Sequence, residues 1–179
     1  MGGAVDDLRY PLGELDMSAP VAESDHPRLI GEIAATPANL RAAIQGLSAE
    51  QMATPYRLGG WTVTQVVHHL PDSHMNAYCR VKLALTENEP MIKPYDEAKW
   101  AALPDSETTP AEVSLTLLES LHIRWVALWR SMKPAEFKRG YFHPDHGRVI
   151  SLQRVLWMYA WHGRHHVAHI TRLRERNRW

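Results

Sequence analysis

Four histidines lie within eight positions of the stretch YAWHGRHHVAHITRL, which spans residues 159–173. Imidazole nitrogens bind divalent transition metals, so such a cluster can form a metal site if its side chains converge. His162 and His166 are four residues apart, which places neighbouring side chains on one face of a helix. Two helical histidines at this spacing can share one metal ion, as in the motif H-E-x-x-H. Gly163 stands where that motif has glutamate, so the general base of those enzymes cannot be assumed here.

The histidines fall on the apolar face of their helix. Apolar residues recur at steps of three and four, and the same steps continue through three histidines: Leu152, Val155, Tyr159, His162, His166, His169 and Leu173. Burying several unpaired imidazoles costs free energy, and a shared metal ion removes that cost. The pattern therefore predicts that His162 and His166 point into the core as metal ligands.

A metal ion that does chemistry needs a third protein ligand and an open coordination position. The segment VVHHLPDSHMN, residues 66–76, supplies the candidates. His69 lies within the apolar arc of its helix, whereas His68 is rotated from it by about 100°. His74 is expected to point elsewhere. We therefore predict His69, on a different helix, as the third ligand.

The remaining histidines receive other roles. We expect His169, one turn beyond His166, to lie behind the ligands or to contact a substrate. His122 is a candidate to line the same cavity. Five others are expected at the surface or in loops: His26, His68, His143, His146 and His165. Asp72 and Trp100 are further candidates for substrate contact.

Four long segments have the apolar spacing of amphipathic helices. The first begins at Pro27, which suits the first turn of a helix, and Pro37 inside it predicts a kink or a restart. The second begins with Thr62 and Gln65, which form the capping-box signature T-x-x-Q. The fourth has Ser151 as its cap.

The third helix is expected to begin with Thr109 as its cap and Pro110 at its first position, and to end before Pro134. Its predicted buried stripe consists of Val113, Leu117, Leu121, Trp125 and Leu128.

Two connections stand out. Residues 88–109 form a long loop, which we expect to be packed through Met91, Tyr95 and Trp100. The two aromatic residues either form a wall over the site or pack in the core. In FKRGYFHPDHGRVISL, residues 137–152, the turn residues 144–147 predict a small β-hairpin before the last helix. These elements predict an all-α fold, a four-helix bundle with one hairpin.

Composition indicates the domain organisation of the chain and argues against some classes of partner. The 179 residues fit a single domain, residues 1–179, with residues 1–24 as an extended N-terminal arm. Twenty basic and twenty acidic residues balance, so we expect no nucleic-acid partner. No apolar run is long enough to span a membrane and the start lacks a secretory signal, so no membrane partner is expected. The single cysteine, Cys79, is typical of a cytoplasmic protein.

The chain also resembles the YfiT-type branch of the DinB superfamily. The resemblance runs through YPLGE, TPYRLGGWTVTQVVHHLPDSHMNAYCRVKLALTE, KPYDEAKWAALPDS, FKRGYFHP and YAWHGRHHVAHITRL. It implies a bundle of unusual connection order, a homodimer, and one divalent metal ion per chain, Zn²⁺ or Ni²⁺, held by His69, His162 and His166. Pro71, two residues after His69, departs from the expected pattern and should kink its helix.

Three functions remain open. The first is a metal-dependent hydrolase in which the cation activates water. The second, implied by the resemblance to bacillithiol S-transferases, is transfer of a low-molecular-weight thiol to a small electrophilic substrate. The third is a non-catalytic metal-binding stress protein, in which the histidines only fasten two helices together. A fourth protein ligand such as His169 would favour this last function.

Overall fold

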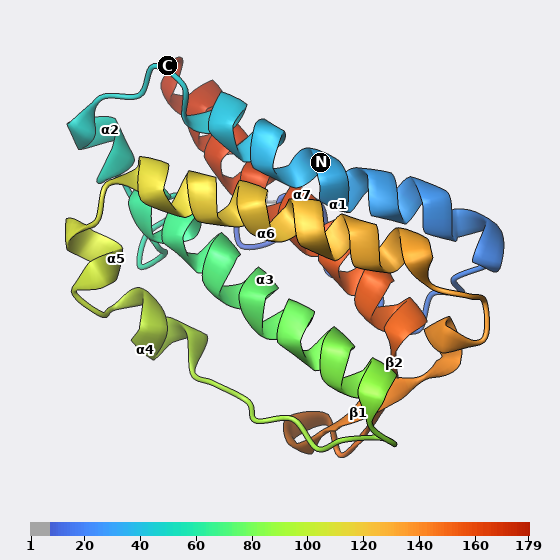
Figure 1. The fold of residues 1–179 in the computed structure, drawn as a ribbon. Helices are drawn as coiled ribbons and strands as arrows, with labels where there is room; N and C mark the ends of the chain where they lie inside the picture. Colours follow the sequence, from blue (N-terminus) through green and yellow to red (C-terminus); the bar gives the residue numbers. More distant parts are fainter. Residues whose placement is uncertain (1–7) are drawn as a thin grey trace, which may run out of the picture.

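The computed structural model describes residues 8–179, and four long helices packed side by side dominate it (Figure 1). The long helices are α1 (His26–Ile44), α3 (Val63–Thr86), α6 (Ala111–Ser131) and α7 (Leu152–Asn177). The short helices are α2 (Ala49–Met52), α4 (Glu97–Ala101) and α5 (Asp105–Thr108), with single 3-10 turns at η1 (Glu23–Asp25), η2 (Glu136–Lys138) and η3 (Pro144–His146). The strands β1 (Gly140–His143) and β2 (Arg148–Ser151) complete the chain and confirm the predicted bundle with a hairpin.

The order of the helices around the bundle differs from their order in the chain. Helix α1 packs against α6 and α7, and α3 packs against the same two helices, so the consecutive helices α1 and α3 lie diagonally opposite. Neighbours α3 and α6 run in the same direction (Figure 1). The segment 87–110 must therefore return along the outside of α3, a helix about 36 Å long at 1.5 Å per residue. This return explains why the predicted loop is so long.

Side-chain caps fix the starts of the two helices that carry the histidine cluster. The Thr62 hydroxyl accepts a hydrogen bond from the Gln65 backbone N–H at 3.1 Å, and the Gln65 side chain accepts one from the Thr62 N–H at 3.0 Å. Ser151 caps α7 by accepting from the Arg154 N–H at 3.3 Å. These caps satisfy backbone donors that a helix start leaves unpaired, and both confirm the sequence prediction.

The hairpin joins α6 to α7. Its strands are antiparallel, with Tyr141 opposite Ile150, and Gly147 adopts a left-handed conformation (φ 59°) in the predicted turn. The long loop is attached to this hairpin through Ile92, whose N–H donates to the Phe142 carbonyl at 3.1 Å. Ile92 is buried, whereas the predicted anchor Met91 is 72% exposed.

Three further expectations were wrong. Helix α1 continues through Pro37 without a restart, and α3 continues through Pro71; the kink expected at each proline stays a prediction. The N-cap of α6 is Pro110, without a side-chain hydrogen bond, so Thr109 is not the cap. The buried stripe of α6 is also displaced from the predicted one, because Val113 and Leu117 face solvent. The buried face consists instead of Ser114, Leu115, Leu118, His122, Trp125, Val126 and Trp129.

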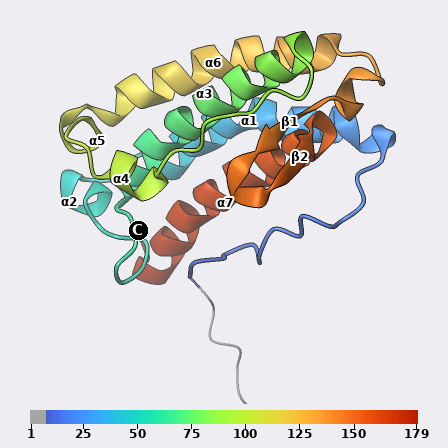
Figure 2. The ribbon, with the colours of Figure 1, turned by 90° about the horizontal axis from the view of Figure 1, so that it is seen from below.

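The N-terminal segment, described from residue 8, runs along α7 (Figure 2). Its backbone carbonyls at Asp16, Ala19 and Val21 accept hydrogen bonds from three side chains of α7: Trp157, Arg154 and Gln153. The first seven residues of the predicted arm lie outside the described residues. Within residues 8–179 no helix is long and apolar enough to cross a membrane.

Candidate metal centre

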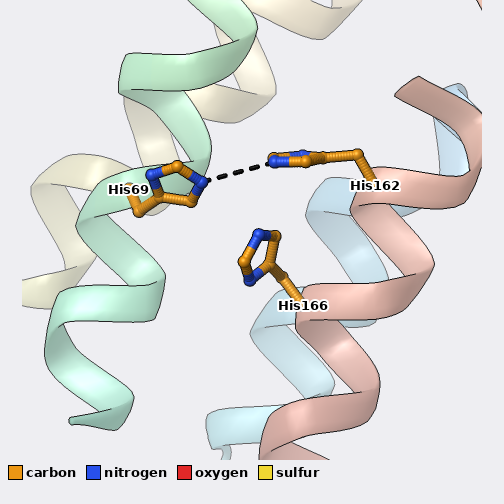
Figure 3. Close-up of side chains that lie close together, drawn as sticks. All are labelled: His69, His162 and His166. Carbon is orange, nitrogen blue, oxygen red and sulfur yellow. Dashed lines mark hydrogen bonds between the residues drawn. The ribbon is translucent and has the colours of Figure 1, made fainter. Parts of the chain in front are cut away.

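The structure brings together the three histidines that the sequence selected. His69 reaches inward from α3, while His162 and His166 project from successive turns of α7 toward it (Figure 3). One ring nitrogen of each residue lies within 4.8 Å of those of the other two. His69 and His166 are buried, and His162 is half-buried. The cluster is therefore formed by two helices that are distant in sequence and adjacent in the bundle.

The donor set fits a divalent cation. The Nε2 atoms of His69 and His162 are 3.3 Å apart, which is long for a hydrogen bond. It matches the separation of about 3.3 Å between two nitrogens that each lie about 2.05 Å from one tetrahedral ion. The ring of His166 completes the group, with its centroid 4.8 Å from that of His69 and 4.5 Å from that of His162.

Burial keeps these imidazoles neutral. Removal from water lowers the pKa of His69 to about 4. The same desolvation, reinforced by the neighbouring histidines, holds the pKa of His162 and His166 well below the ordinary value. Only a neutral imidazole has a lone pair for a metal, so the site requires little free energy to deprotonate its ligands.

His169 lies beside the cluster with a different partner. Its Nε2 donates a hydrogen bond to the Arg9 carbonyl at 3.0 Å, and its ring stacks on Tyr56 with centroids 3.9 Å apart. The His169 and His166 rings are 5.3 Å apart. His169 therefore packs behind His166 and is held by the N-terminal segment, and it is not a member of the three-histidine group.

Sequence reasoning missed one residue behind His162. His74, expected to point elsewhere, is fully buried, and its Nε2 lies 3.0 Å from Nδ1 of His162. His122 of α6, predicted as a candidate to line the cavity, follows, with its Nε2 2.7 Å from Nδ1 of His74. The available signal was the position of His74, four residues after Leu70 and three before Ala77 on the buried face of α3.

Trp61 was also missed. Its ring lies 4.6 Å from that of His69 and 6.2 Å from that of His166, so it covers one side of the cluster. It directly precedes the cap Thr62, and this position at the start of the His69 helix was the available signal.

Three histidines expected at the surface are buried. His26 stacks on Phe137, His68 bonds to Ser114 at 2.7 Å, and His165 stacks on Trp161. Each of these rings packs against an aromatic ring or bonds to a hydroxyl group, although one ring nitrogen of each has no hydrogen-bond partner among the described residues. The remaining two lie in the hairpin turn, where His146 is exposed and His143 is half-buried.

Two candidates for substrate contact have other neighbours. Asp72 is partly buried; this burial, with the nearby Asp105, raises its pKa to about 6. Trp100 packs against Tyr95 with ring centroids 4.4 Å apart. Both lie on the side of α3 that the returning segment covers, and the structure does not place them with the three histidines.

Gly163, between His162 and His166, has a packing role. A β-carbon at this position would lie 2.4 Å from Oγ1 and 2.8 Å from Cγ2 of Thr36 on α1. The residue where the motif H-E-x-x-H has glutamate therefore faces α1 at close approach, away from the metal ligands. This explains why no side chain occupies the position.

Comparisons with known proteins agree with this geometry. The family model for the DinB superfamily matches residues 32–170. A "putative metal-dependent hydrolase" of Bacillus mycoides (strain KBAB4) is 53% identical over 173 residues, which are 97% of this chain and 99% of that protein. One of Bacillus cereus (strain AH820), with the same description, is 53% identical over 98% of this chain and 100% of its own length.

A solved structure also resembles this chain over nearly its whole length. YfiT from Bacillus subtilis, described as "a probable metal-dependent hydrolase with an unusual four-helix bundle topology", superposes with a TM-score of 0.93 at 47% identity. The match covers 97% of this chain and 99% of that one. The diagonal placement of α1 and α3 is the corresponding departure from a simple up-and-down bundle. The chain therefore belongs to the DinB superfamily, in its YfiT-type branch.

Proposed function

We propose that the protein is a metal-dependent hydrolase in which His69, His162 and His166 hold one divalent cation. The observation that carries the proposal is the convergence of three neutral imidazole nitrogens within 4.8 Å in the bundle core. A cation with three imidazole ligands lowers the pKa of a water molecule or thiol at a remaining position. The relatives described as metal-dependent hydrolases support the same chemistry.

The neighbours of the cluster favour catalysis over a purely structural metal. A structural zinc site is closed by four protein ligands, whereas a catalytic site has three and an open position. His169, the next histidine along α7 after His166, donates its Nε2 proton to the Arg9 carbonyl and stacks on Tyr56. The group that can hold an ion thus has three members among the described residues. His162 is half-buried, so we infer that a small substrate approaches from its side.

The ligand assignment is tested by metal analysis. The purified parent should contain about one divalent cation per chain by mass spectrometry, and His166→Ala should lose most of it. His146→Ala, which removes an exposed histidine from the hairpin turn, is the matched control and should retain the metal. Retention of a full complement of metal by His166→Ala would show that His166 is not a ligand. The same analysis identifies the native metal, Zn²⁺ or Ni²⁺.

Activity assays separate hydrolysis from thiol transfer. The metal-loaded protein is incubated with a panel of activated esters and amides, and separately with several low-molecular-weight thiols and monochlorobimane. Hydrolysis that is lost with a chelator and absent in His166→Ala supports the proposal. Metal-dependent conjugation without hydrolysis would replace it with the thiol S-transferase.

We also propose that the chain forms a homodimer, as its resemblance to the family implies. Light scattering after size-exclusion chromatography, with and without the metal, tests this point. A mass of 20.4 kDa in both conditions would contradict it.

A further inference from the structure

Three imidazoles form a continuous row from the proposed metal site to the far side of the bundle. Nδ1 of His162 lies 3.0 Å from Nε2 of His74, and Nδ1 of His74 lies 2.7 Å from Nε2 of His122. Nδ1 of His122 lies 2.8 Å from the backbone carbonyl of Ile33. Each ring therefore uses both nitrogens, and the row links α7, α3, α6 and α1.

The polarity of this row, meaning which nitrogen of each ring donates and which accepts, is fixed at the Ile33 end. A carbonyl oxygen only accepts hydrogen bonds, so Nδ1 of His122 must carry the proton and donate it. This carbonyl is free to accept because the residue four positions later in α1 is Pro37, which has no N–H. His122 thus pairs with the backbone acceptor that the proline leaves without its helical donor.

Each ring of the row carries one ring proton. His74 is fully buried, and His122 is 2% exposed. Among the described residues neither ring has a carboxylate partner, and a buried imidazolium without one is costly, so both rings are neutral. A neutral imidazole has one N–H and one lone pair, so fixing one nitrogen also fixes the other.

The polarity therefore passes from ring to ring. His122 donates from Nδ1 to Ile33, so its Nε2 accepts and Nδ1 of His74 must donate to it. Nε2 of His74 then accepts, and Nδ1 of His162 must donate. This leaves the lone pair of His162 on Nε2, the atom that lies 3.3 Å from Nε2 of His69.

We propose that His74 and His122 are positioning residues that hold His162 in the tautomer required of a metal ligand, with the polarity set by the Ile33 carbonyl. The proposal rests on the metal site proposed above and adds to it the residues that prepare one ligand before the cation arrives. A metal-binding histidine is commonly oriented by a partner at its other nitrogen. Here that partner is itself oriented by another imidazole and finally by the backbone.

The tautomers can be measured directly in the metal-free parent. Protein with ¹⁵N-labelled histidine is recorded in long-range ¹H–¹⁵N correlation spectra, which distinguish Nδ1–H from Nε2–H rings, and single His→Gln variants assign the signals. We expect His122, His74 and His162 all to be neutral Nδ1–H tautomers. An Nε2–H tautomer at any of the three positions would overturn the proposal. This result does not depend on whether the protein binds a metal, so it is separate from the test of the proposed function.

Metal affinity tests the consequence. His122 is suited to substitution because its ring nitrogens contact His74 and Ile33, not a proposed ligand. His122→Met and His122→Gln have similar shapes, but the glutamine carbonyl is a good hydrogen-bond acceptor for His74, whereas the methionine sulfur is a weak one. We expect Zn²⁺ affinity, measured by competition with a chromophoric chelator, to fall about 10-fold in His122→Met, the lower end of the usual range for such partners. His122→Gln should bind more tightly than His122→Met.

His26→Gln is the control for loss of a buried imidazole as such, because His26 stacks on Phe137 in the core cluster at the start of α1. It should bind Zn²⁺ like the parent. Equal affinity of His122→Met and the parent would overturn the proposal, as would equal losses in His122→Met and His122→Gln. If His122→Met does not fold, the spectra of the parent still decide the question.

Discussion

Helix α7 approaches α1 closely at Gly163, so replacing this glycine should have two opposing effects on the stability of the protein. In Gly163→Ala the new β-carbon would lie 2.4 Å from Oγ1 of Thr36, against about 3.5–4.0 Å for an ordinary carbon contact. The two helices must separate by about 1 Å or Thr36 must change rotamer, and overpacking of this kind costs about 1–3 kcal/mol. Alanine in place of glycine recovers about 1 kcal/mol of helix propensity. The net loss of stability is therefore up to about 2 kcal/mol.

Gly31→Ala provides the matched control. Gly31 also lies inside a long helix, α1, but nothing is within 4 Å of its β-carbon position. This variant should be stabilised by about 0.5–1 kcal/mol. The two variants make the same chemical change and differ only in what the added methyl group meets.

Thermal and urea unfolding of the metal-free proteins measures the effect, and a change of 1 kcal/mol corresponds to about 2–4 °C in Tm. The double variant with Thr36→Ala removes Oγ1 and Cγ2, the two closest atoms, and leaves Cβ at 3.2 Å, so Gly163→Ala should cost much less stability in that background. Because Gly163 separates His162 from His166, Zn²⁺ affinity should also fall in Gly163→Ala. Equal stabilisation of the Gly163 and Gly31 variants would refute the reasoning.

Three further outcomes are expected. Thr62→Ala removes the side-chain cap of α3 and should cost about 1 kcal/mol in urea unfolding, while Thr116→Ala, at an exposed position inside α6, tests whether any helical threonine has this effect. Metal titrated into the metal-free protein should raise its stability by about 2.7 kcal/mol when free metal exceeds Kd about 100-fold, and no rise would exclude specific binding to the folded state. The pKa of His122 is about 4 when folded and 6.5 in the unfolded chain, so the unfolded chain binds more protons between these values. Stability of the metal-free protein should be full above pH 6.5 and fall toward pH 4 by at most about 1.4 kcal/mol per pH unit for this group, with a shallower slope in His122→Gln.

The sequence was informative where a pattern is local. The capping signatures at Thr62 and Ser151 are read from adjacent residues, and the hairpin turn from Pro144 to Gly147 likewise. The convergence of the three histidines could also be expected, because apolar stripes on two helices must face the same core.

Other features depend on which helices become neighbours. Helix α6 carries two apolar faces, one through Val113 and Leu117 and one through Leu115 and Leu118, and periodicity alone does not choose between them. Packing against α1 and α3 selects the second face and brings His122 into the core. The row of imidazoles could not be predicted for the same reason. It involves four helices, and the order of these helices around the bundle cannot be deduced from the sequence of any one of them.

Pro37 lowers the stability of α1, but it also leaves the Ile33 carbonyl free to accept the hydrogen bond that orients His122. A proline in a helix interior costs about 3 kcal/mol, so Pro37→Ala is an obvious choice for making α1 more robust. The new N–H at position 37 would compete with His122 for the Ile33 carbonyl. Selection for heat resistance alone would therefore favour a more stable chain in which His162 is held less firmly in the tautomer that binds a metal. Pro37 should therefore be kept when the protein is engineered for stability.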